Sequence, residues 1–130
     1  MTDTVPHVVY HVACMGNWRD VIREQFALLK ECGLAAELAR IGDTVGVTHL
    51  GPADTLPVVQ SEARRYGVPM RVVKSDPNTD HYETLAMLEI EWLAKNAMAS
   101  RPILYMHTKG VSNPADVNKR KWRKVMEHYV

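Results

Sequence analysis

The 130-residue chain has only two cysteines, Cys14 and Cys32, and they stand in neither a CxxC motif nor any His/Cys spacing typical of metal ligands. This spacing excludes a disulfide framework and a zinc ribbon as the basis of the fold. We therefore expect two reduced thiols that are buried or half-buried as small apolar side chains.

The chain also has little net charge and no long apolar segment. Its 16 basic and 15 acidic residues leave a formal charge of +1, too balanced for a partner held by bulk electrostatics, so we do not expect a nucleic acid or a membrane surface as its partner. The start of the sequence has no basic region and only a short apolar run, which predicts neither a signal peptide nor a spanning helix. The expected location is cytoplasmic.

Three common active-site motifs are missing from the sequence. There is no GxGxxG for a dinucleotide, no GxxxxGK[ST] for a phosphate-binding loop, and no GxSxG for a nucleophilic serine. A ligand, if there is one, must be bound by less common residue patterns.

Strand-like and helix-like patterns alternate along the chain. Short runs rich in β-branched residues predict strands over 7–14, 44–51, 70–75 and 102–106. Apolar residues spaced by three or four predict helices within 18–33, 52–67 and 81–99. Asn17 is expected to cap the first helix and Gly33 to end it, and Leu85, Leu88 and Trp92 are expected to share a face of the last.

This alternation of strands and helices predicts a single α/β domain over 1–130 with three layers and a mainly parallel sheet built from Rossmann-like βαβ units. Ligands of such sheets bind outside the carboxyl ends of the strands. Four segments are therefore candidates by position, "CMGNW", "HLGPAD", "KSDPNTD" and "HTKG".

The segment "HTKG" follows the fourth expected strand. His107 has a side chain suited to an acid, a base, a metal ligand or a hydrogen-bond donor, although a structural hydrogen bond is an equal alternative. Lys109 fits a phosphate contact, with Gly110 permitting a close approach of the backbone, and the alternative is a solvated loop lysine.

The segments before the first and third expected helices are also polar. The turn "MGNW" presents backbone amides to an anion or merely caps its helix. Asp76 and Asp80 are expected to cap the third helix, whereas Tyr82 and Glu83, an aromatic beside a carboxylate, suit a base and ribose. The basic segment from Lys119 to Lys124 is read as a solvated face, with nucleic acid as a less favoured alternative.

Taken in order, "VYHVACMGNWRD", "VGVTHLGP", "HYETLAMLEIEWLAKN", "LYMHTKGVS" and "KWRKVMEHYV" resemble bacterial and viral glycosyltransferase-like proteins of the GT-A type, which share a strand ending in YxHTKG. The resemblance covers nearly the whole chain. It implies a nucleotide-diphospho-sugar donor across the strand ends, bound by Met15, Asn17, Tyr82, Glu83, His107, Lys109 and Gly110.

Two departures from the family qualify this expectation. GT-A enzymes commonly hold a divalent metal, manganese or magnesium, through Asp-x-Asp at the end of the fourth strand, where this chain has His107, Thr108 and Lys109. Related proteins also continue beyond the segment that matches here. The chain is therefore expected to be a donor-binding half that is truncated or needs a partner chain or a second copy for transfer, and the alternative is a non-catalytic interaction domain of the same fold.

Overall fold

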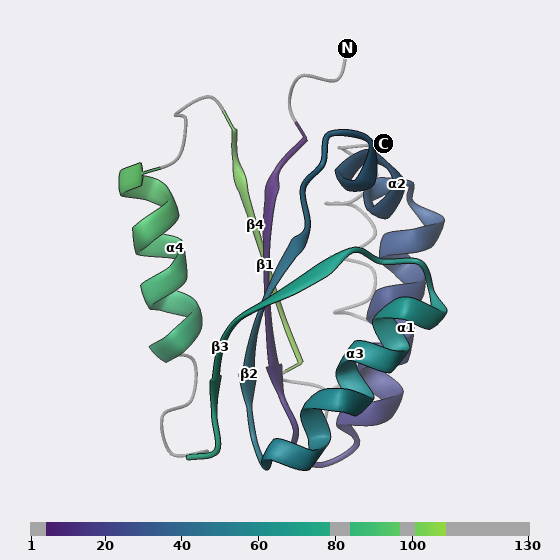
Figure 1. Ribbon diagram of the computed structural model, residues 1–130, viewed down its shortest axis with the longest axis vertical. Coiled ribbons are helices and arrows are strands. Elements are labelled where there is room, and N and C mark those ends of the chain that lie inside the picture. Colours follow the sequence, from purple (N-terminus) through teal and green to yellow (C-terminus); the bar gives the residue numbers. More distant parts are fainter. Residues whose placement is uncertain (1–4, 79–83, 97–100, 109–130) are drawn as a thin grey trace.

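The computed structural model describes residues 5–78, 84–96 and 101–108, which form a parallel sheet between two layers of helices (Figure 1). The four described strands are β1 (His7–Ala13), β2 (Val45–Leu50), β3 (Met70–Asp76) and β4 (Ile103–His107), and they lie in the order β3-β2-β1-β4. Every described strand pair is parallel. The predicted three-layer α/β architecture is confirmed.

Helices cover both faces of the sheet. One face carries α1 (Trp18–Glu31), α2 (Leu34–Arg40) and α3 (Leu56–Arg65), the last preceded by a short 3-10 turn, η1 (Ala53–Thr55). The other face carries α4 (Thr84–Asn96), which is the one described helix on that side of the sheet in Figure 1. None of the helices within the described ranges is both long enough and apolar enough to span a membrane.

The first helix departs from its prediction at its start and is followed by a helix that was not predicted. Asn17 occupies the N-cap position of α1, but its side chain makes no capping hydrogen bond, so the predicted side-chain cap is wrong. Gly33 adopts a left-handed conformation with φ 88°, as a residue that ends a helix does. The chain then starts the seven-residue helix α2 directly from this glycine.

The main core lies between the sheet and the face covered by α1. Alternate residues of β1, Val8, Tyr10 and Val12, point toward this helix because successive strand side chains lie on opposite faces. The Tyr10 ring meets the Phe26 ring edge to face, with centroids 5.5 Å apart. Both rings are fully buried, so this contact fixes how α1 sits on the sheet.

The helix α4 packs on the sheet through few of its apolar side chains. Its buried side chains are Ala86 and Glu89, whereas Leu88 is 46% exposed and Trp92 is 57% exposed. A small alanine lets the helix approach the sheet closely, and this leaves the larger apolar side chains outside. Leu85, Leu88 and Trp92 were expected to share a face of this helix, and Leu88 and Trp92 on that face lie outside the core.

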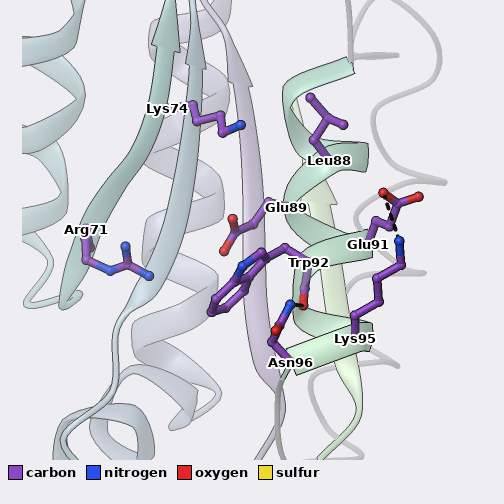
Figure 2. A pocket seen from close by; sticks show the side chains of 8 residues that line it. All are labelled: Arg71, Lys74, Leu88, Glu89, Glu91, Trp92, Lys95 and Asn96. Carbon is purple, nitrogen blue, oxygen red and sulfur yellow. Dashed lines mark hydrogen bonds and ion pairs between the residues drawn. The ribbon is translucent and has the colours of Figure 1, made fainter.

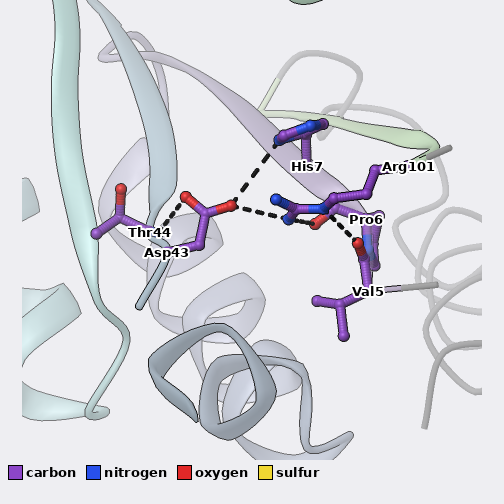
Figure 3. A network of polar contacts seen from close by, with 6 residues as sticks. All are labelled: Val5, Pro6, His7, Asp43, Thr44 and Arg101. Carbon is purple, nitrogen blue, oxygen red and sulfur yellow. Dashed lines mark hydrogen bonds and ion pairs between the residues drawn. The ribbon is translucent and has the colours of Figure 1, made fainter. Parts of the chain in front are cut away.

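A polar cluster ties three segments together at the amino ends of the strands (Figure 3). Arg101, just before β4, donates from Nε to the Val5 carbonyl (2.8 Å) and from Nη2 to the Pro6 carbonyl (3.1 Å). Its Nη2 also pairs with Asp43 Oδ2 at 2.8 Å, just before β2. One guanidinium thus holds the approaches to β1, β2 and β4 in register.

Candidate functional site

The order in which strands are added to the sheet reverses between β1 and β4, although these two strands are parallel. The connections that follow β1 and β2 run through α1, α2 and α3 on one face, and the connection from β3 to β4 runs through α4 on the other. At such a reversal the loops leave the sheet in opposite directions and open a crevice at the carboxyl ends of the strands. The candidate site is therefore at the ends of β1 and β4.

Two of the predicted residues lie on the loop between β1 and α1. Met15 is about half exposed, and Asn17 is exposed at the first turn of α1. Gly16 between them has φ 63°, a left-handed conformation that a glycine adopts without strain. Because the Asn17 side chain caps no amide, the amino end of α1 presents backbone N–H groups beside an amide that is not used for capping.

His107 is the last residue of β4 and pairs in register with His11 of β1. It is half-buried, and its ring centroid lies 5.4 Å from that of Tyr105. Its carbonyl accepts a hydrogen bond from Gln25 Nε2 (3.1 Å), and the oxygen of the same Gln25 amide accepts one from the Tyr10 hydroxyl. The end of β4 is thus fixed from α1 through a buried glutamine.

Thr108 has a structural role that the sequence did not reveal. Its buried hydroxyl accepts from the Ala13 N–H (2.9 Å) and donates to the Ala13 carbonyl (3.2 Å). Its own N–H donates to the His11 carbonyl (3.1 Å). Thr108 therefore closes the seam between the ends of β1 and β4, so any ligand at this edge must bind outside it.

The remaining predicted site residues, Tyr82, Glu83, Lys109 and Gly110, lie outside the described residues, as does Asp80. The described part of the chain brings Met15 and Asn17 to the end of β1 and His107 to the neighbouring end of β4. Asp76 ends β3, and its side chain accepts from the Asn78 N–H (2.9 Å) in a turn, while the segment that it was expected to cap begins outside the described residues.

A second polar group at this edge surrounds His49, the first residue of the candidate segment "HLGPAD", although its hydrogen-bond partners were not predicted. Thr55 Oγ1 donates to the Pro52 carbonyl (2.6 Å), so it must accept from His49 Nε2 (2.7 Å). His49 Nδ1 then accepts from the Ser75 hydroxyl (2.7 Å). Burial lowers the pKa of His49 below its usual value, in agreement with this neutral tautomer.

A further buried histidine, His11, is hydrogen-bonded through Nδ1 to Thr48 Oγ1 (2.9 Å). No simple pattern distinguishes these histidines from exposed ones, because each lies inside a strand beside apolar residues. The signal that could have found them is their position in strands expected to be covered on both faces, where a polar side chain needs a partner.

The described residues at this edge do not fit a divalent metal. Within 5–78, 84–96 and 101–108, no three His, Cys, Asp or Glu side chains gather as ligands. At the end of β4 the Thr108 hydroxyl is hydrogen-bonded to Ala13, and none of the residues His107, Thr108 and Lys109 has a carboxylate.

Comparison with known proteins gives no relative. No protein-family model, no curated protein and no solved structure matches this chain. The fold and the geometry of the strand ends are therefore the basis for the function proposed below.

Proposed function

We propose that this chain binds a nucleotide-diphospho-sugar across the carboxyl ends of β1 and β4, as the donor-binding part of a glycosyltransferase-like protein. The observation that carries this proposal is the reversal of strand order between β1 and β4, with Met15 and Asn17 following β1 and His107 ending the neighbouring β4. Parallel α/β sheets bind their ligands at this position.

The chemistry of the edge suits an anionic ligand. The first N–H groups of α1 and the Asn17 amide offer hydrogen bonds to phosphate oxygens, and the helix dipole adds a favourable field. Lys109, which follows Thr108 in the sequence, supplies a cation next to the diphosphate in this proposal. The base and ribose are assigned to Tyr82 and Glu83, on the resemblance alone.

The proposal needs no metal for binding. Where related enzymes neutralise the diphosphate with a metal ion, Lys109 and the amino end of α1 take that role here. In the transfer reaction the bond between the sugar and the nucleotide diphosphate breaks, and negative charge develops on the diphosphate. Positive groups beside the diphosphate stabilise this leaving group.

The test is thermal unfolding of the purified protein with UDP-, GDP- and dTDP-sugars, each with and without manganese. A ligand that binds only the folded state at 100 times its Kd adds about 2.7 kcal/mol to stability. We expect one nucleotide family to raise the melting temperature, and His107→Ala and Lys109→Ala to reduce that rise. Lys30→Ala, an exposed lysine at the opposite end of α1, is the matched control and should leave it unchanged.

A well-folded protein that no nucleotide-sugar stabilises would contradict the proposal. That result would favour the non-catalytic interaction domain.

A further inference from the structure

A second pocket lies away from the strand ends, between the edge strand β3 and α4 (Figure 2). Its volume is about 490 Å³, within the size range of small-molecule sites. Arg71 and Lys74 of β3 line one side, and Leu88, Glu89 and Trp92 of α4 line the other. No residue assigned to the nucleotide-sugar site contributes to it.

One carboxylate that lines this pocket has no partner among the described residues. Glu89 is 8% exposed and projects from α4 toward β3. It makes no hydrogen bond or ion pair with any residue in the described part of the chain. A buried carboxylate without a donor is costly, so the pocket favours a ligand that presents N–H groups to Glu89.

The opposite wall carries positive charge. Arg71 and Lys74 are exposed, and neither forms an ion pair or hydrogen bond with a residue that the structure describes. At the rim, Lys95 and Glu91 neutralise each other at 3.7 Å, so they leave the charge of β3 uncompensated. This wall favours an anionic group on the same ligand.

The indole of Trp92 supplies an apolar surface. Trp92 is 57% exposed beside the pocket, and Figure 2 shows its ring below Glu89, projecting from α4 toward the side of Arg71. None of the ring contacts among the described residues involves this indole, so its face is free to stack on a planar group. The ligand is therefore planar as well as anionic.

From these features we propose that the pocket binds a guanine nucleotide. Trp92 stacks on the base, Glu89 accepts hydrogen bonds from N1–H and the 2-amino group, and Arg71 and Lys74 bind the phosphate. Guanine is the common base with two adjacent N–H donors that match the two oxygens of a carboxylate. Adenine, cytosine and uracil each place an acceptor beside their donor, where it would face Glu89.

The test is equilibrium dialysis of the whole protein with GMP, and with AMP and inorganic phosphate as comparison ligands. A bidentate contact to the correct base is worth about 1–3 kcal/mol, so GMP should bind about 5- to 150-fold more tightly than AMP. Glu89→Gln keeps the size of the side chain but places an amide donor against the base, and it should abolish this preference. Arg71→Ala should weaken GMP and AMP alike.

The controls separate this pocket from the strand ends and from general effects on folding. Glu31→Gln, an exposed carboxylate at the end of α1 on the other face of the sheet, should leave GMP binding unchanged. Lys109→Ala should also leave it unchanged, which keeps this result independent of the nucleotide-sugar test. Equal binding of GMP and AMP, displacement of GMP by an equal concentration of inorganic phosphate, or no GMP binding at millimolar concentration would each overturn the proposal. If Glu89→Gln fails to fold, Trp92→Leu, at an exposed position, replaces it and should weaken GMP binding at least fivefold.

Discussion

Replacing Arg101 by methionine tests whether one guanidinium holds the amino ends of three strands together. The substitution keeps the apolar stem and removes hydrogen bonds to Val5, Pro6 and Asp43 (Figure 3). A hydrogen bond that involves a charged group contributes about 1.5–3 kcal/mol when buried. The Arg101 side chain is 23% exposed and that of Asp43 32% exposed, so water replaces part of this energy. We expect a loss of about 2–4 kcal/mol.

Urea unfolding measures this loss as a lower midpoint at an unchanged slope. The matched control is Arg40→Met, because Arg40 also pairs with a carboxylate at 2.8 Å, that of Glu37, but on the exposed surface of α2. It should cost less than about 0.5 kcal/mol. A double-mutant cycle with Asp43→Asn then isolates the ion pair, which we expect to contribute about 1 kcal/mol, with the carbonyl contacts supplying the rest. An Arg101→Met protein that loses no more than the Arg40→Met control would refute the reasoning.

Two further predictions concern the carboxyl ends of the strands. Burial lowers the pKa of His49, so the unfolded chain binds a proton at this residue more readily than the folded protein does. The free energy of unfolding should therefore fall as the pH drops below about 6.5, by at most about 1.4 kcal/mol per pH unit for this group. Denaturant unfolding between pH 7 and 5 should show a smaller pH slope in His49→Gln, and an equal slope in both proteins would show that His49 is not responsible. Gly51 has φ 144°, and a Cβ built on it lies 2.9 Å from Cys14 Cβ, so Gly51→Ala should destabilise the protein by about 2 kcal/mol or more. Thermal unfolding measures this loss. The control is Gly42→Ala, because Gly42 also has a positive φ, 73°, but a Cβ added there has no atom within 4 Å. Equal losses of stability in the two variants would attribute the effect to the backbone conformation and not to the contact with Cys14.

The order of elements could be predicted because its signals are local. Each strand is a short β-branched run, and the left-handed Gly33 and Gly67 end helices where the sequence indicated. The helix α2 was missed because a glycine taken as an end is also its start. The buried face of α4 could not be predicted from periodicity, since apolar residues occur around much of that helix and packing selected Ala86.

The candidate site was predictable in position but not in detail. The strand ends follow from the βαβ order alone, and that order placed Met15, Asn17 and His107 at neighbouring ends. The role of Thr108 depends on Ala13, which is 95 residues away in the chain. The residues around Thr108 in the sequence do not show whether its hydroxyl is exposed or bonded to a residue far away in the chain.

This separation also matters while the protein is being synthesised. A ribosome delivers β1 first, and β2 and α1 can pack on it early, but the other hydrogen-bonding edge of β1 waits for β4. Until residue 108 has emerged, that edge is unpaired and able to pair with strands of other nascent chains. The rate at which the α4 and β4 segments are translated therefore sets how long the growing chain is exposed to misassembly.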